Sequence, residues 1–162
     1  MTMLVTLKPA TKEDCSTILK IQTNAFSHLL LKYQDYDSSP AAESLDNILQ
    51  RFEQPFTDYY LIMLSDDPIG MLRVCNFTES CRLSPICVLQ EYQGKGYAQE
   101  AIRLMEKCYP DAKKWELDTI AQEKKLCNLY EKIGYRKTGR VEHIQEGMDL
   151  VFYEKIMKES GL

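Results

Sequence analysis

The sequence predicts an α/β (α+β) fold, in which helices cover both faces of a mixed, mostly antiparallel central sheet of about seven strands. Three observations predict it. Short apolar runs bounded by turn residues recur seven times. Four other segments place apolar residues at helical spacing. Strand and helix segments alternate so that hairpins and strand–helix crossovers both occur, which requires a mixed sheet.

The first two helices have identifiable starts. A strand at residues 4–8 leads to Thr11, whose hydroxyl can cap a helix with acids in its first turn. The apolar stripe of this helix is Ile18, Ile21, Ala25 and Leu29. After a break at residues 36–40, we expect Ser39 to cap a second helix and Pro40 to occupy its first turn. Its stripe is Leu45, Ile48, Leu49 and Phe52.

The middle of the chain is predicted to form strands. Residues 59–65 and 69–76 form a predicted hairpin around the turn at 66–68. The apolar run 61–64 also suits a buried helix, so periodicity leaves that alternative open. A further strand is expected at residues 82–89, after the turn at 78–80.

The C-terminal part alternates helix and strand. A helix with the stripe Ala98, Ala101, Ile102 and Met105 ends at Pro110, and a strand follows at residues 114–120. The last helix carries the stripe Leu126, Leu129, Tyr130 and Ile133 and ends at Gly134, a residue typical of C-caps. Strands at 135–141 and 148–155 form a predicted hairpin around Glu146 and Gly147.

Composition excludes several classes of protein. The chain has 162 residues, of which 44% are hydrophobic and 27% charged, as in ordinary globular domains. A net charge of −4 argues against bulk nucleic-acid binding. No segment reaches the roughly 18 apolar residues of a membrane span, and the N-terminus lacks the pattern of a secretory signal. We therefore expect a cytoplasmic protein that binds neither nucleic acid nor membranes.

The cysteines and histidines show no metal-binding pattern. There are six cysteines and two histidines, and no two cysteines form a C-x-x-C pair. We expect no metal site and no disulfide framework, and interpret the cysteines as reduced thiols that act as small hydrophobic residues. They are Cys15, Cys75, Cys81, Cys87, Cys108 and Cys127, and the histidines are His28 and His143.

The segment QEYQGKGYAQEA at residues 90–101 is the strongest functional signal. It is not a Walker loop, because Lys95 is followed by Gly96 and not by Ser or Thr. It is not a dinucleotide fingerprint, because Gln99 stands where Gly or Ala is needed. The segment does link a strand to a helix start, where the six backbone N–H groups from Gln93 to Ala98 can hold a pyrophosphate. Lys95 adds a positive charge nearby.

The same segment resembles a known family. Residues 86–98, ICVLQEYQGKGYA, resemble the acyl-coenzyme A signature of the GNAT superfamily of N-acetyltransferases. Its core, [RQ]-x-x-G-x-[GA], is met by Gln93, Gly96 and Ala98, and the preceding V-x-P-E-Y pattern is met except that Gln90 replaces proline. Residues 129–135, LYEKIGY, resemble the L-Y-E-K-x-G-F stretch of the family's last helix. The order of elements follows the family from about residue 3 to residue 156.

The resemblance implies a small, bacterial-type, single-domain N-acetyltransferase spanning residues 1–162, with a GNAT-like acyl-CoA N-acyltransferase fold. Such an enzyme moves an acetyl group from acetyl-CoA, its co-substrate, to a primary amine of a small molecule or protein by direct attack. The cofactor-binding residues that it implies are Ile86, Cys87, Val88, Gln93, Gly94, Lys95, Gly96, Tyr97, Ala98 and Glu123. Glu123 is a departure, because the family often has an asparagine there.

The resemblance also assigns two catalytic roles. The backbone N–H of Val88 would stabilise the oxyanion, and Tyr130 would be the general acid that protonates the departing thiolate. The reference pKa values of a thiol and a phenol are about 8.5 and 10, so full proton transfer in water is unfavourable by about 1.5 pKa units, a gap that a hydrogen bond or a shifted pKa in the site could close. Periodicity alone offers a different interpretation, in which Tyr130 is a core aromatic residue.

The general base and the acceptor stay open at this stage. Asp118, Glu79 and His143 are candidate bases, each also suited to a solvated surface, and a water chain could serve instead. The segments 33–39 and 142–148 are expected to select the acceptor. The side chains that would suit a cationic amine such as a polyamine, lysine or aminoglycoside are Tyr33, Asp35, Tyr36 and Asp37. Ordinary turn chemistry would explain them equally.

Two alternative functions are consistent with the same residues. The chain could be a non-catalytic module that binds acyl-CoA, or a protein-interaction module on the same fold. The sequence leaves open the acceptor amine, the acyl-chain preference and the oligomeric state, including a homodimer.

Overall fold

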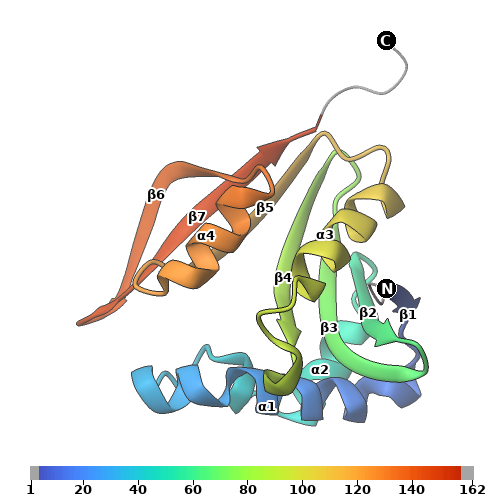
Figure 1. The fold of residues 1–162 in the computed structure, drawn as a ribbon. Helices are drawn as coiled ribbons and strands as arrows, with labels where there is room; N and C mark the ends of the chain where they lie inside the picture. Colours follow the sequence, from blue (N-terminus) through green and yellow to red (C-terminus); the bar gives the residue numbers. More distant parts are fainter. Residues whose placement is uncertain (1–3, 158–162) are drawn as a thin grey trace.

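The computed structural model describes residues 4–157 and shows one seven-stranded sheet, in the order β1-β2-β3-β4-β5-β7-β6 (Figure 1). Neighbouring strands are antiparallel except β4 and β5, which are parallel. This confirms the predicted mixed, mostly antiparallel sheet. The strands are β1 (Val5–Pro9), β2 (Thr57–Leu64), β3 (Asp67–Asn76), β4 (Ser80–Val88), β5 (Lys114–Ile120), β6 (Arg136–Gln145) and β7 (Met148–Ile156). The α-helices are α1 (Cys15–Tyr33), α2 (Leu45–Phe52), α3 (Tyr97–Cys108) and α4 (Lys124–Lys132), and three 3-10 turns lie at Lys12–Asp14, Pro40–Ala42 and Gln90–Tyr92.

Helices cover both faces of the sheet, as expected. One buried cluster joins α1 and α2 to the sheet through residues such as Ile18, Ile48 and Met71. A larger cluster joins α3 and α4 to the other face through residues such as Ile102 and Trp115. The run Leu61–Leu64 belongs to β2 and pairs with β3, so the helical alternative for this segment is wrong.

The sheet is forked between β4 and β5. Only three residue pairs connect these strands, and the last is Arg82 with Glu116. Beyond that pair the two strands diverge toward their carboxyl ends (Figure 1), while β5 pairs with β7 along its whole length. Pro85 lies where the pairing of β4 with β3 also shifts, in keeping with its lack of an N–H donor. The fork therefore exposes backbone edges at the carboxyl ends of two parallel strands, a common place for ligands.

The second helix starts later than predicted. Pro40 heads a separate 3-10 turn, with the Ala41 N–H donating to Ser39 Oγ at 3.2 Å. The α-helix begins only at Leu45, after Ser44. Between them Glu43 adopts an extended backbone, and its carboxylate accepts from Gln22 at 3.0 Å and pairs with Arg51. Proline therefore does start a helical turn, but the extended Glu43 ends that turn after three residues and separates it from α2.

Two global properties bear on function. None of the helices within residues 4–157 is long and apolar enough to cross a membrane. All six cysteines carry free thiols, and only Cys108 among them is exposed. The other thiols pack in the interior as small apolar groups.

Buried tyrosines should make the fold sensitive to alkali. Burial, the first cause in each case, raises the pKa of Tyr130, Tyr135 and Tyr153. A raised folded-state pKa means that their contribution to stability is complete below the unfolded pKa of about 10 and is lost as the pH rises above it. We expect the free energy of unfolding to fall by about 4 kcal/mol per pH unit above pH 10, which is about 1.4 kcal/mol for each of the three. Guanidinium unfolding at pH 9 to 11 measures this fall, and a flat profile would contradict it.

Candidate active site

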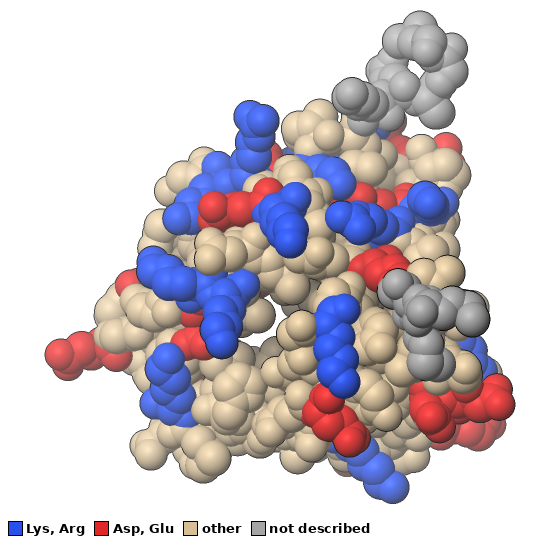
Figure 2. All heavy atoms as spheres, in the orientation of Figure 1, with Lys and Arg blue, Asp and Glu red and all other residues tan. Residues whose placement is uncertain are grey.

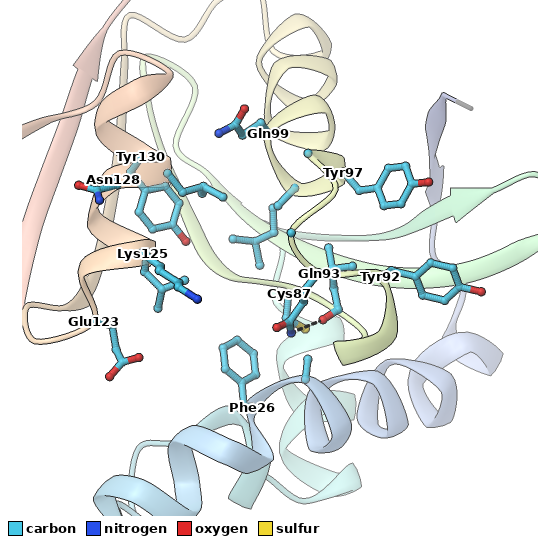
Figure 3. Close-up of a pocket in the computed structure, with 18 of the residues that line it drawn as sticks. Phe26, Cys87, Tyr92, Gln93, Tyr97, Gln99, Glu123, Lys125, Asn128 and Tyr130 are labelled. Atoms are coloured by element: carbon cyan, nitrogen blue, oxygen red, sulfur yellow. Dashed lines mark hydrogen bonds between the residues drawn. The ribbon is translucent and has the colours of Figure 1, made fainter. Parts of the chain in front are cut away.

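A cleft of about 740 Å³ opens at the fork, between α1, β4, the loop before α3, and α4 (Figure 3). It is visible in Figure 2 as an opening near the centre of the face, with basic side chains on both sides. Of the eleven residues predicted for the cofactor and the chemistry, ten line this cleft, and only Lys95 does not. The ten are Ile86, Cys87, Val88, Gln93, Gly94, Gly96, Tyr97, Ala98, Glu123 and Tyr130. The Lys95 ammonium instead lies 5.9 Å from the ring centre of Tyr92.

The glycine loop presents a continuous run of backbone donors. Gly94 and Gly96 have φ of +77° and +85°, a left-handed conformation that favours glycine, and Gly96 is the residue before α3. The N–H of Gln93 donates to the Gln90 carbonyl at 3.2 Å, so it is not available as predicted. The six N–H groups from Gly94 to Gln99 have no partner within residues 4–157. The donor run is therefore as long as expected but begins one residue later.

The hydrogen bonds of Gln90 account for a glutamine at the position where the family pattern has proline. Its N–H donates to Asn24 Oδ1 at 3.1 Å, and its side-chain Nε2 donates to the Asn24 carbonyl at 2.9 Å and to Ser27 Oγ at 3.0 Å. A proline could make none of these bonds, because it has neither the N–H nor the amide group. Gln90 thus ties the loop to α1.

The backbone of Val88 faces the open side of the fork. Leu89 N–H donates to the Ile69 carbonyl at 2.8 Å, and in an antiparallel pair hydrogen-bonded positions alternate. The N–H and C=O of Val88, which lies opposite Gly70, therefore point away from β3 and toward the fork. Gln93 Nε2 donates to the Val88 carbonyl at 2.8 Å (Figure 3), so this carbonyl is occupied. The Val88 N–H belongs to the preceding peptide and takes no part in the pairing of β4 with β3.

Gly70 permits the close approach of β3 to β4 at this point. A Cβ at Gly70 would lie 2.5 Å from the Cys87 carbonyl oxygen and 3.3 Å from Val88 Cα. The Cys87 side chain packs on the opposite face, with α1, and burial raises the pKa of its thiol. The Cys87 thiol is therefore a buried apolar group, and the backbone at Val88 carries the polar character of this wall.

Tyr130 is both a core residue and a cleft residue. It belongs to the cluster under α3 and α4 and is 7% exposed, yet its hydroxyl points into the cleft (Figure 3). That hydroxyl has no hydrogen-bond partner within residues 4–157. Burial first, and then the charge of Asp118, raise the pKa of Tyr130. The phenol is therefore fully protonated at neutral pH and available as a donor.

The direction of this pKa shift corrects one expectation. Either a hydrogen bond or a shifted pKa was expected to bring the phenol closer to a thiol, whereas burial moves the pKa of Tyr130 upward. The same burial raises the pKa of the Cys87 thiol in the adjoining wall. A low-dielectric wall disfavours both a phenolate and a thiolate, so burial raises the pKa of both acids. Proton transfer depends on the difference between the two pKa values, and burial acts on both in the same direction.

A second, smaller cavity of about 260 Å³ adjoins the cleft. The two cavities share Phe26, Leu29, Ile86, Leu126 and Tyr130. The smaller cavity is bounded further by the loop after α1 and by the start of β7. Tyr130 therefore stands where two separate approaches to the fork meet, as a reaction between two substrates requires.

The structure separates the three candidate bases. Asp118 lines the smaller cavity, where its carboxylate pairs with Arg82. Glu79 is 71% exposed and lies 3.3 Å from Lys113, and His143 is 70% exposed and lies 2.8 Å from Asp149. Neither Glu79 nor His143 lines either cavity. Of the residues proposed for acceptor selection, Tyr33 and Asp35 line the smaller cavity, whereas Tyr36 and Asp37 do not.

A comparison with family models decides the classification. The model of the acetyltransferase (GNAT) family matches residues 18–135, which is most of the chain. The chain belongs to the GNAT acetyltransferase family. It is therefore an acyltransferase that moves an acetyl group from acetyl-CoA to an amine.

Solved structures share the GNAT fold at low identity. An acetyltransferase from Thermus thermophilus is 16% identical, with a TM-score of 0.74 over 97% of this chain and 100% of that one. The ribosomal-protein-S18-alanine N-acetyltransferase from Escherichia coli is 13% identical, with a TM-score of 0.78 over 98% and 97%. The spermidine N-acetyltransferase from Vibrio cholerae, in complex with CoA and spermine, is 18% identical, with a TM-score of 0.77 over 98% of each chain. A sequence comparison with curated proteins finds no match.

Glu123, the departure from the GNAT asparagine, is neutralised by α1. Its carboxylate accepts from Lys32 Nζ at 2.7 Å and from the Tyr33 hydroxyl at 2.5 Å. Burial alone would raise the pKa of Glu123, but the hydrogen bonds from Lys32 and Tyr33 outweigh it and lower that pKa. Glu123 thus lines the cleft as a paired carboxylate that joins the end of α1 to the start of α4.

Sequence reasoning missed part of the GNAT cleft. On α4 the missed residues are Lys125, Asn128 and Lys132, and on α1 they are Phe26 and His28. The three on α4 are spaced i, i+3 and i+7, so helical periodicity places them on one face together with Leu129. That signal was present in the sequence, but polar residues on a helix are ordinarily interpreted as a solvated face.

Proposed function

We propose that the larger cleft holds acetyl-CoA, with its pyrophosphate on the glycine loop and its thioester between Val88 and Tyr130. The observation that carries this proposal is the run of six unpaired N–H groups from Gly94 to Gln99, next to the unpaired edge of β4. Backbone donors at a helix start favour a pyrophosphate. Lys125 and Lys132 add positive charge to the same cleft, and its one acid, Glu123, is neutralised by Lys32. The residues present therefore fit this co-substrate.

The chemistry follows from where the donors point. Acetyl-CoA supplies an activated acetyl group that an amine can attack directly. The Val88 N–H, which points toward the fork, would donate to the carbonyl oxygen of the thioester as negative charge develops on it. Tyr130 would donate its proton to the departing sulfur, since its hydroxyl is protonated and faces the cleft. The nitrogen loses a proton as it becomes an amide, and Tyr130 recovers a proton through solvent, so that the products are an amide and free CoA thiol. The amine would arrive through the smaller cavity, which reaches Tyr130 from the other side.

An amine-panel assay tests this function. Free CoA release is measured with acetyl-CoA and a panel of monoamines, polyamines, amino acids and N-terminal peptides, and acetyl-CoA binding is measured separately by calorimetry. We expect binding without any amine and amine-dependent release of CoA. Binding without release for every amine would favour the non-catalytic acyl-CoA-binding module, and absence of binding would favour the interaction module.

A further inference from the structure

The smaller cavity, through which the amine would arrive under the proposed function, is lined by acidic side chains and by no basic ones within residues 4–157. The only charged side chains that line it within residues 4–157 are Asp35 and Asp118, and no lysine, arginine or histidine does so. A carboxylate or phosphate on the acceptor would meet these two carboxylates and no cation of the lining, because Arg82, which pairs with Asp118, is not among the lining residues. Like-charge juxtaposition is unfavourable at an interface. The cavity therefore disfavours acidic acceptors.

The walls of the cavity are mostly apolar. Side chains from α1, β4, β5 and β7 contribute hydrocarbon surface, among them Phe26, Leu83, Leu117 and Met148. Its volume of about 260 Å³ lies below the roughly 300–1,000 Å³ of sites for drug-sized ligands. A small hydrocarbon or aryl group fits such walls because it gains by leaving water, whereas a strongly polar body loses hydrogen bonds there.

The two carboxylates differ in whether they have an oxygen without a hydrogen-bond partner. Both oxygens of Asp35 are engaged by Ser38 in the same turn, Oδ1 with its N–H at 3.2 Å and Oδ2 with its hydroxyl. Asp118 uses Oδ2 for Arg82, and its Oδ1 has no partner within residues 4–157. Asp118 also lies on β5 two residues beyond the last pair with β4, in the same cavity as Tyr130. Its charge acts on the Tyr130 hydroxyl, which shows that the two groups are electrostatically close.

We propose that Asp118, held in place by Arg82, binds the ammonium group of the acceptor, and that the acceptor is a small primary amine with an apolar body and no acidic group. This inference rests on the proposed function. Arg82 pairs with Asp118 Oδ2, which leaves Oδ1 without a partner within residues 4–157 and available to the amine. The carboxylate binds the cationic amine beside Tyr130, and the nitrogen passes one proton to solvent before it attacks the thioester. The apolar walls hold the body of the amine. Together these contacts define specificity for arylalkyl or alkyl monoamines.

Three probes of related shape test the acceptor class. Phenethylamine has an apolar body, phenylalanine adds a carboxylate to that body, and putrescine replaces the aryl group with a second ammonium. We expect kcat/KM for phenethylamine to exceed that for phenylalanine by at least about 100-fold, the equivalent of a like-charge penalty of about 3 kcal/mol. We expect it to exceed that for putrescine as well. A preference for phenylalanine, putrescine or an N-terminal peptide would overturn the inference while leaving the transfer reaction in place.

Substitution of Asp118 tests the anchor itself. In Asp118→Asn, KM for phenethylamine should rise by roughly 10- to 100-fold through the loss of a charge-assisted hydrogen bond, while KM for acetyl-CoA stays unchanged. Asp118→Glu should recover part of the loss. The matched control is Glu116→Gln on the same strand, which pairs with Lys114 and lines neither cavity.

The pattern of Michaelis constants separates the possible results. Equal rises in both KM values for Asp118→Asn would show a structural role and overturn the anchor. An unchanged KM for phenethylamine would overturn it too. If no amine releases CoA from the unsubstituted enzyme, the proposed function fails and this inference fails with it. If the enzyme turns over but its kcat/KM values rank the amines in a different order, this inference fails and the proposed function stands.

Discussion

Gly96→Glu should abolish measurable binding of acetyl-CoA. At φ +85° any side chain is strained by about 1–2 kcal/mol, and the new carboxylate would project from the centre of the donor run. No protein atom lies within 4 Å of the added Cβ, so the loop keeps its shape and the effect falls on the ligand. Repulsion between a carboxylate and a pyrophosphate adds to the strain. We expect calorimetry to show affinity reduced by more than about 100-fold.

A matched substitution separates strain from ligand repulsion. Gly139→Glu introduces the same side chain at φ +94°, again with no atom within 4 Å, on exposed β6 and outside both cavities. It should lose stability to a similar degree but bind acetyl-CoA normally. If Gly96→Glu binds acetyl-CoA as well as Gly139→Glu does, the loop is not the pyrophosphate site.

Tyr130→Phe should lower kcat by about 100-fold or more, the usual range for removal of a general acid. The hydroxyl makes no hydrogen bond within residues 4–157, so its removal leaves no protein group unsatisfied and stability should change little. The ring still fills the core position under α3 and α4. Acetyl-CoA affinity should therefore be retained, and the loss should appear in single-turnover rates.

Tyr60→Phe provides the control for Tyr130→Phe. Tyr60 is partly buried and lines neither cavity. The substitution removes a hydroxyl that lies 2.8 Å from the Tyr109 hydroxyl. Its kcat should equal that of the unsubstituted enzyme. Equal turnover by the Tyr130 variant on every accepted amine would remove the acid role and leave Tyr130 as a core aromatic residue.

Local patterns predicted the elements well where local forces decide them. The stripe that includes Tyr130 identified α4, because helical spacing of apolar residues directly reflects a buried face. The start of α2 was misplaced at Pro40, because Glu43 adopts an extended backbone and its carboxylate contacts Gln22 of α1 as well as Arg51 of α2. Propensity rules contain no information about such tertiary contacts.

The candidate site was predictable to the extent that backbone and motif define it. The loop followed from a strand–glycine–helix pattern and Val88 from the resemblance to the GNAT signature, whereas the exact donor run depended on a 3-10 turn that takes up the Gln93 N–H. The pairing of Arg82 with Asp118 joins residues 36 positions apart in the sequence and required the parallel register of β4 and β5. The upward pKa shift of Tyr130 likewise depended on burial that only the packed structure defines.

The fork has a consequence for the cohesion of the whole fold. Because β4 and β5 share only three pairs, the sheet consists of two hydrogen-bonded halves that meet at one corner. A ligand that pairs with the free edge of β4 while contacting α4 acts as an additional strand between these halves. Part of its binding free energy would then stabilise the contact between the two halves of the sheet. We therefore expect the substrate-bound chain to unfold more cooperatively than the free chain.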